Sequence, residues 1–149
     1  MTESAQQNAH LLGVLYVSSA AGPMPSGALA EILTVSRDRN QSDGVSGLLL
    51  YRSGNFMQYL EGPREAVVRT KARIYRDPRH GGIITVAELP TTARRFAGWS
   101  MGFANCDDPA IRAMDGFSRF LDLDFRGEAV AGAADYALRM LEHFRDKMR

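Results

Sequence analysis

Residues 44–62, GVSGLLLYRSGNFMQYLEG, decide the fold of this chain. Apolar and β-favouring residues dominate 46–52 and again 55–61, and Ser53-Gly54 between the two runs is a typical hairpin turn. Gly62-Pro63 interrupts the second run, and proline suits the first turn of a helix. The stretch therefore predicts an antiparallel hairpin whose second strand leads directly into a helix.

Turn signals divide the rest of the chain into further short elements. A loop rich in Gly and Pro at 20–27 precedes a helical pattern, Ser42-Asp43-Gly44 ends that helix, and Asp77-Pro78 ends the next one. In chain order, the sequence predicts a strand at 11–18, a helix from Ser26 to Arg39 or Asn40, the two hairpin strands, a helix from Pro63 to about Arg76, strands at 83–89 and 100–104, and helices at 111–120 and 128–148.

This order, βαββαββ followed by two helices, is typical of an α+β protein with a ferredoxin-like sheet. In that topology the first and third strands are neighbours at the centre of the sheet, and right-handed crossovers place two helices on one face. The position of the fifth strand does not follow from the sequence. We expect residues 1–105 to form one domain and residues 106–149 to form a C-terminal helical extension that packs on it or carries its output.

Composition and charge argue against several classes of partner. The 149 residues contain 18 Lys and Arg against 17 Asp and Glu, and this balance gives no electrostatic reason to expect a nucleic acid or an acidic membrane surface. A single cysteine, Cys106, excludes an internal disulfide, and no apolar run approaches the ~20 residues that a membrane span needs. We therefore expect a cytoplasmic protein that binds no membrane, no metal and no nucleic acid directly.

Two polar side chains fall where the sheet should be apolar. Strand alternation places Tyr16 and Gln58 on faces that are otherwise apolar, on two strands that the topology makes neighbours. A buried amide or hydroxyl without a partner costs ~1–3 kcal/mol, so each must bond the other or a bound polar ligand. From these residues alone, a structural Tyr–Gln bond and a ligand site both stay open. For Asn40, two interpretations likewise stay open: a residue that ends the helix and a residue that contacts a ligand.

Five short motifs, in this order and spacing, resemble the BLUF family of blue-light sensors that use FAD. The resemblance covers Leu11 to Phe103, and Ser46 and Tyr59 depart from the family pattern, which more often has Thr and a smaller aliphatic residue there. The motifs are Tyr16-Val17-Ser18, Ser36-Arg37-Asp38-Arg39-Asn40, 44–51 continued by 54–62, Asp77-Pro78-Arg79-His80, and Trp99-Ser100-Met101-Gly102-Phe103.

The resemblance implies FAD as the cofactor and assigns residues to it. The flavin ring would lie between the two helices, with apolar walls from Ile32 and Ile74. Asn40 would bond the C4 carbonyl and the N3 edge, since an amide both donates and accepts, and Arg39 would lie near the pyrimidine end. The residues expected near the ribityl chain or the phosphates are Arg79 and His80.

The resemblance also implies a switch and an output. Excitation of the flavin would draw an electron from Tyr16, the proton would pass by way of Gln58, and Gln58 would be left with a rotated or tautomerised amide. Trp99 and Met101, two apart on the predicted fifth strand, are expected to share a face and to relay the change to the C-terminal helices. The tail is too short for a cyclase, phosphodiesterase or DNA-binding domain. We therefore expect a non-enzymatic sensor that forms a homo-oligomer and acts on a separate effector protein.

Two other functions stay open. One is a flavin-binding redox enzyme. Two observations argue against it: no catalytic base is evident, and Cys106 has no second cysteine with which to pair. The other is a ferredoxin-like interaction module that is not photoactive. The presence of Tyr16, Asn40 and Gln58 together argues against this last reading.

Overall fold

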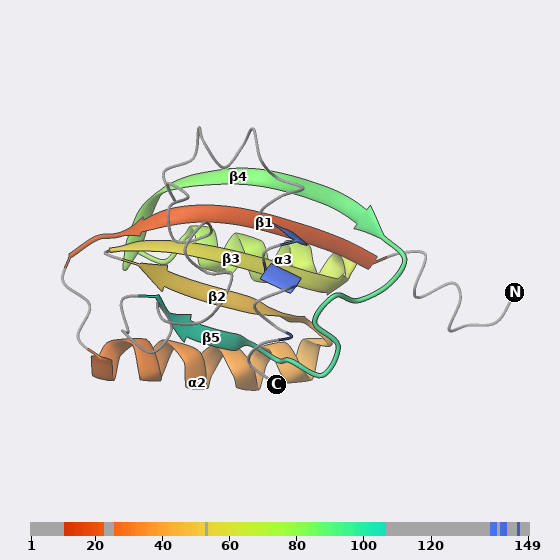
Figure 1. The fold of residues 1–149 in the computed structure, drawn as a ribbon, viewed down its shortest axis with the longest axis horizontal. Coiled ribbons are helices and arrows are strands. Elements are labelled where there is room, and N and C mark those ends of the chain that lie inside the picture. Colours follow the sequence, from red (N-terminus) through yellow and green to blue (C-terminus); the bar gives the residue numbers. More distant parts are fainter. Residues whose placement is uncertain are drawn as a thin grey trace, which may run out of the picture.

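The structure is a computed structural model that describes residues 11–22, 26–52, 54–106, 138–139, 141–142 and 146. The predicted helix at 111–120 lies outside the described residues, and the described part of the predicted helix at 128–148 is helical. No helix in the described ranges is long and apolar enough to cross a bilayer. The elements in Figure 1 are β1 (Leu11–Ala20), α2 (Ser26–Asp43), β2 (Ser46–Arg52), β3 (Asn55–Pro63), α3 (Arg64–Tyr75), β4 (His80–Thr91) and β5 (Gly102–Asn105).

The strands of the described residues form one five-stranded sheet in the order β4-β1-β3-β2-β5. β1 is antiparallel to both β3 and β4, β2 is antiparallel to β3, and β5 lies parallel to β2 at the edge. The ferredoxin-like prediction is confirmed, with β1 and β3 adjacent at the centre. The structure adds the position of β5, which the sequence left open.

α2 is longer than the sequence predicted. It continues to Asp43, beyond the predicted end at Arg39 or Asn40. The chain leaves the helix at Gly44, whose φ of +72° lies in the left-handed region that favours glycine. The amide N–H of Val45 then donates to the carbonyl of Asn40 at 2.8 Å. Asn40 is therefore an interior residue of the last turns and not the terminator.

The boundaries of two strands also differ from the prediction. β4 begins at His80 rather than Ile83, because its first residues pair with the end of β1 as far as Ala20. β5 begins at Gly102 rather than Ser100. Both starts are set by pairing with strands distant in sequence, which local turn signals do not reveal.

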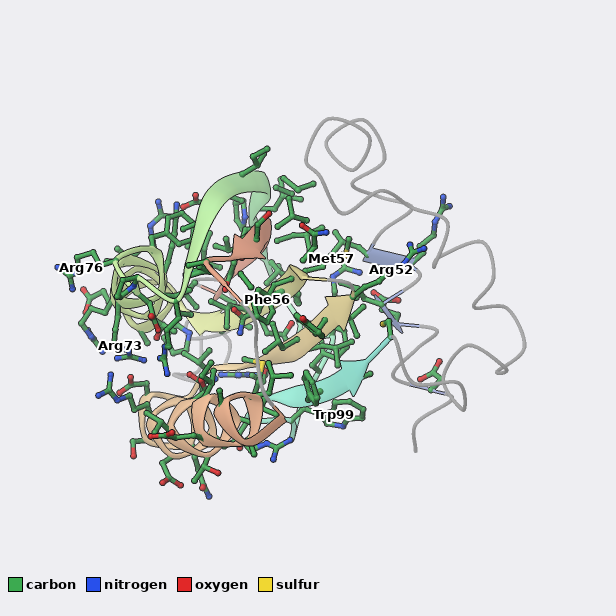
Figure 2. The ribbon with its side chains drawn as sticks, turned by 90° about the vertical axis from the view of Figure 1, so that its left-hand side faces the viewer. Arg52, Phe56, Met57, Arg73, Arg76 and Trp99 are labelled. Carbon is green, nitrogen blue, oxygen red and sulfur yellow. The ribbon has the colours of Figure 1, made fainter. Side chains whose placement is uncertain are left out.

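Each face of the sheet has its own hydrophobic core. Figure 2 shows Phe56 on the side of α2 and α3 and Met57 on the other side, as strand alternation requires. The helix-side core includes Val14, Leu29, Leu33, Leu60 and Val67. The far-side core includes Leu15, Leu48, Leu50, Leu138 and Leu141. Leu138 and Leu141 therefore pack on the face opposite α2 and α3.

A buried carboxylate connects the centre of the sheet to the segment between β4 and β5. Glu61 of β3 is 0% exposed, and its Oε2 accepts from Ser46 Oγ at 2.9 Å and from the Phe96 N–H at 2.7 Å. Its Oε1 accepts from the Arg95 N–H at 2.7 Å. The Arg95 side chain forms an ion pair with Glu142 of the C-terminal segment. Glu61 thus fixes a segment that itself contacts the C-terminal helix.

We predict that Glu61→Gln lowers the free energy of unfolding by about 2–3 kcal/mol, measured by urea denaturation. The amide offers one acceptor oxygen where the carboxylate has two, so its NH₂ group would face a buried donor. Glu88→Gln is the matched control, because Glu88 pairs with Lys71 at the surface and such a pair contributes about 0–1 kcal/mol. Equal stability of the two variants would contradict the assignment.

Candidate functional site

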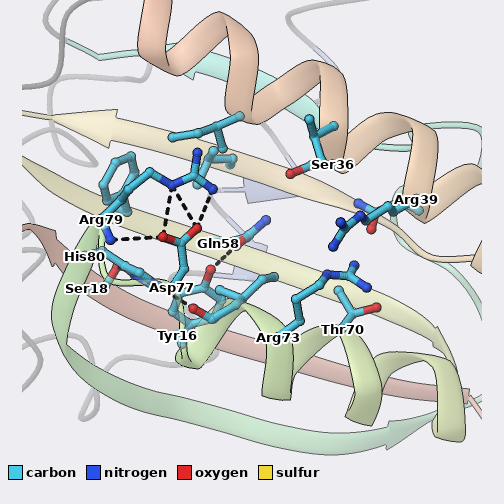
Figure 3. A pocket seen from close by; sticks show the side chains of 16 residues that line it. Tyr16, Ser18, Ser36, Arg39, Gln58, Thr70, Arg73, Asp77, Arg79 and His80 are labelled. Atoms are coloured by element: carbon cyan, nitrogen blue, oxygen red, sulfur yellow. Dashed lines mark hydrogen bonds and ion pairs between the residues drawn. The ribbon is translucent and has the colours of Figure 1, made fainter.

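A pocket of about 200 Å³ lies on the helix side of the sheet, between α2 and α3. Figure 3 shows the side chains that line it. Strands β1 and β3 form its floor, the two helices form its walls, and the segment 77–80 closes one end. It brings together all the residues predicted for the switch and for flavin contact, which are Tyr16, Ile32, Arg39, Asn40, Gln58, Ile74, Arg79 and His80.

The floor of the pocket is a buried hydrogen-bonded chain. Tyr16 and Gln58 are direct partners in the β1–β3 register and are 2% and 5% exposed. The Tyr16 hydroxyl donates to Gln58 Oε1, and Gln58 Nε2 donates to Met101 Sδ at 3.4 Å. Burial raises the pKa of Tyr16 far above its ordinary value of 10, so this phenol is a neutral donor at physiological pH.

Two aromatic side chains hold the ring of Tyr16. Tyr75 packs edge-on against it, with ring centroids 5.3 Å apart and planes at 71°, and the His80 ring lies 6.4 Å away. His80 Nε2 donates to the Ile74 carbonyl at 2.6 Å, so in the neutral imidazole Nδ1 accepts from Ser18 Oγ at 2.8 Å. His80 therefore forms part of the pocket wall with both ring nitrogens already bonded.

Arg79 at the mouth of the pocket is already paired. Its Nε lies 2.9 Å from each carboxylate oxygen of Asp77, and its backbone N–H donates to Asp77 Oδ1 at 2.9 Å. Hydrogen bonds from the Arg79 side chain are the main reason that the pKa of Asp77 lies below its usual range, since burial acts in the opposite direction. The Arg79 side chain is 53% exposed, so it can still move to meet a ligand.

Asn40 connects the pocket to the segment that precedes β5. Its side chain is buried, and Nδ2 donates to the Ser100 carbonyl at 2.7 Å. On either side of that carbonyl, the Trp99 oxygen accepts from the Gly47 N–H at 2.9 Å and the Met101 oxygen accepts from Arg37 Nε at 2.9 Å. Three successive carbonyls of residues 99–101 are thus held by α2 and β2.

The prediction that Trp99 and Met101 share a face of the fifth strand is wrong. Both residues precede β5, in an irregular segment where strand alternation does not apply. Met101 belongs to the helix-side core and contacts Gln58, whereas Trp99 packs with Phe96 against the far-side core at a centroid distance of 6.2 Å. The Trp99 ring lies over Gly102 and leaves no space there for a Cβ atom.

A sequence profile described as "Sensors of blue-light using FAD" (BLUF) matches residues 11–102, more than half of the chain. The chain belongs to the BLUF family. It is a blue-light sensor flavoprotein, and FAD is the cofactor by which the family is defined.

Solved structures of BLUF proteins share this fold. The dark-state structure of BlrB is 32% identical with a TM-score of 0.71, and the match covers 87% of this chain and 94% of that one. A bacterial light-regulated adenylyl cyclase is 26% identical with a TM-score of 0.69, covering 89% of this chain and 36% of the cyclase.

Curated BLUF relatives are much longer proteins. The photoactivated adenylate cyclase subunit beta of Euglena longa is 36% identical over 99 residues, which are 66% of this chain and 12% of the relative. The blue light- and temperature-regulated antirepressor BluF of Escherichia coli is 34% identical over 86 residues, which are 58% of this chain and 21% of the relative. The chain thus spans about an eighth of the first of these relatives and about a fifth of the second.

The chemistry of the pocket fits a flavin ring. Such a ring is flat and apolar at one end, with carbonyl and N–H groups at its pyrimidine edge. The pocket offers apolar side chains from facing helices, Ile32 of α2 and Ile74 of α3, above a floor that carries the Gln58 amide. Amides and guanidinium groups that suit a pyrimidine edge come from Asn40, Arg39 and Arg73.

Arg73 is a pocket residue that the sequence reasoning missed. Figure 3 shows Arg73 of α3 and Arg39 of α2 reaching toward one another across the pocket, and neither has a hydrogen-bond or ion-pair partner among the described residues. Desolvation and then the nearby charge of Arg39 lower the pKa of Arg73. The helical spacing of Thr70, Arg73 and Ile74 was a usable signal, because residues three and four apart share a face.

We predict that the protein loses stability as the pH rises above about 10. Burial raises the pKa of Tyr16 above 10 and that of Tyr59 to about 12, so the unfolded state releases these protons first. The contribution of the two tyrosines to the free energy of unfolding is complete below pH 10. It is lost as the pH rises through their pKa values in the folded state. Urea denaturation from pH 9 upward should show a flatter profile for Tyr16→Phe/Tyr59→Phe than for the wild type. An identical slope in the double variant would contradict the prediction.

Proposed function

We propose that Tyr16 and Gln58 are the light-operated switch of this sensor. The observation that carries the proposal is the buried chain from the Tyr16 hydroxyl through the Gln58 amide to Met101 Sδ, on the floor of a pocket suited to a flavin ring. A tyrosine can be oxidised and can release its proton along the bond that it donates. Among the residues that the structure describes, the hydrogen-bond partner of the Tyr16 hydroxyl is Gln58.

Different residues around the pocket would bind different parts of FAD. When bound, FAD supplies the absorption of blue light and accepts an electron. Ile32 and Ile74 would exclude water from the ring faces, and Asn40 would bond the pyrimidine edge together with Arg39 and Arg73. The remaining contacts that we propose, to the ribityl chain or the phosphates, are Arg79 and His80.

The switch itself uses both polar groups of the Gln58 side chain, the amide oxygen and the amide NH₂ group. Tyr16 loses an electron, and its phenolic proton passes to Gln58 Oε1 along the existing hydrogen bond. When the electron returns, Tyr16 also regains a proton, and Gln58 is left with its original number of protons but with its amide rotated or tautomerised. Either change alters the hydrogen bond that Gln58 Nε2 donates to Met101 Sδ. Met101 therefore responds directly to the state of Gln58.

The output follows from the contacts of residues 92–101. Met101 and Ser100 are bonded to α2, while Trp99 and Phe96 pack on the far-side core that contains Leu138 and Leu141. A coupling of ~1–3 kcal/mol through such a segment is typical of switches and is sufficient to alter the docking of the C-terminal helix.

We propose that the signal passes to a separate effector protein and that the sensor performs no turnover of its own. The support for this is the similarity to BluF of Escherichia coli, which is described as a blue light- and temperature-regulated antirepressor. We also propose a homo-oligomer, a location in the cytoplasm, and no direct contact with nucleic acid, in agreement with the near-neutral charge.

Tyr16→Phe is expected to abolish the light response and to leave FAD bound. The phenyl ring keeps the packing against Tyr75 but cannot donate to Gln58 or release a proton. The measurement is the visible spectrum before and after blue light, where the wild type should shift slightly to the red and return in the dark. Gln58→Leu should behave in the same way.

Tyr51→Phe is the matched control for this experiment. Tyr51 belongs to the same side of the sheet but packs against Phe56, with centroids 5.2 Å apart. Its variant should retain the full red shift. A normal red shift in Tyr16→Phe would overturn the proposed switch.

Met101→Leu is expected to weaken the light-dependent signal at the C-terminal helix. The substitution keeps an apolar side chain of similar size and removes the sulfur acceptor of the Gln58 amide. Light-minus-dark amide hydrogen exchange in peptides covering residues 92–101 and 138–146 measures the effect. Met57→Leu, next to Gln58 but on the far face, is the control, and equal effects of the two substitutions would contradict the relay.

A further inference from the structure

We propose that Tyr75 is a second electron donor, which reduces Tyr16 again after Tyr16 has been oxidised. The proposal rests on the proposed role of Tyr16 and adds a residue to it. Tyr75 is the last residue of α3, and its hydroxyl bonds Thr85 of β4, the strand that pairs with β1 on the side away from β3.

The geometry places the two phenols in series between the pocket and the surface. The Tyr75 ring contacts the Tyr16 ring edge-on at a centroid distance of 5.3 Å. The Tyr75 hydroxyl shares a 2.7 Å hydrogen bond with Thr85 Oγ1. Thr85 is also the partner of Tyr16 in the β1–β4 register, so Tyr75 reaches across Tyr16 to bond the neighbouring strand.

The surroundings of the two phenols favour oxidation of Tyr75. An oxidised tyrosine gives up its proton readily only if the proton has an acceptor. Tyr16 is 2% exposed and its hydroxyl bonds the Gln58 amide, which is a poor base. Tyr75 is half-buried, and its hydroxyl bonds exposed Thr85, through which a proton can reach water. The oxidised site is therefore more stable on Tyr75 than on Tyr16.

Nearby charge moderates this preference without removing it. Lys71 Nζ lies 5.4 Å from the centre of the Tyr75 ring, and a cation there disfavours loss of an electron. The same ammonium group is paired with Glu88 Oε2 at 2.8 Å, which offsets its field. Both residues are solvent-accessible, so water screens them further.

The transfer balances in electrons and protons. One electron passes from Tyr75 to the Tyr16 radical, and Tyr16 takes back its proton from Gln58. Tyr75 gives its phenolic proton to Thr85, whose hydroxyl releases one to water. The products are intact Tyr16 and a neutral Tyr75 radical near the surface. Because Gln58 returns to its starting form, this step competes with the switch.

Other oxidisable side chains in the described residues are less well placed. Trp99 lies against the far-side core, and Tyr51 packs against Phe56. Among the described aromatic residues, only Tyr75 and His80 have a ring contact with Tyr16. Tyr75 is thus the candidate that the geometry selects.

The test is electron paramagnetic resonance of the FAD-loaded full chain, frozen under blue light. The wild type should give a tyrosyl radical signal that is lost in Tyr75→Phe, which keeps the ring contact but is not oxidisable. Thr85→Val keeps Tyr75 but removes its proton acceptor, and should weaken the signal. Tyr51→Phe is the control and should match the wild type. In parallel, the yield of the red-shifted state per absorbed photon should rise in Tyr75→Phe.

The outcomes separate this proposal from the switch on which it rests. No tyrosyl radical in the wild type, or the same radical in Tyr75→Phe, overturns the role of Tyr75 while a normal red shift leaves the switch intact. A red shift that persists in Tyr16→Phe overturns the switch instead. If Tyr75→Phe binds FAD poorly, the Thr85→Val variant decides, since an unchanged radical in that variant counts against the proton route.

Discussion

The antiparallel register of β1 and β3 is the constraint on which the rest of this structure depends. It places Tyr16 opposite Gln58 on the helix side of the sheet, where both are buried and each meets the other's hydrogen-bonding need. A slip of one residue would turn both side chains to the other face. The hydrophobic cores on both faces prevent such a slip, because alternate apolar residues of the central strands belong to opposite cores: Leu12, Val14 and Leu60 to the helix-side core, and Leu15, Val17 and Met57 to the far-side core.

Strand β3 also connects the two faces of the sheet. Gln58 points into the pocket, and Tyr59 and Glu61 point to the far side, where Glu61 holds the backbone of Arg95 and Phe96. The segment 92–101 is therefore bonded to β3 near its start and to the pocket residue Asn40 near its end. A change at Gln58 has a short physical route, through Met101 and this segment, to the residues that pack on the C-terminal helix.

Much of the fold and most of the pocket were predictable because they depend on local patterns. The hairpin at 46–61 followed from alternation and one turn, and the order of elements then placed Tyr16 beside Gln58. The segment 99–101 was not predictable, since its conformation is set by bonds from Gly47, Asn40 and Arg37, far away in the sequence. For this reason Trp99 and Met101 diverge to opposite faces. Arg73 and Tyr75 were missed because a helix of charged residues offers many candidate faces until its partner helix is known.

In the proposed switch, light alters the side-chain amide of Gln58, and infrared difference spectroscopy measures that amide directly. The FAD-loaded protein, prepared with isotopically labelled glutamine, is compared before and after blue light. We predict a light-induced amide band that shifts with the label and is missing in Gln58→Leu. A difference spectrum that shows the flavin response but no band sensitive to labelled glutamine would contradict it.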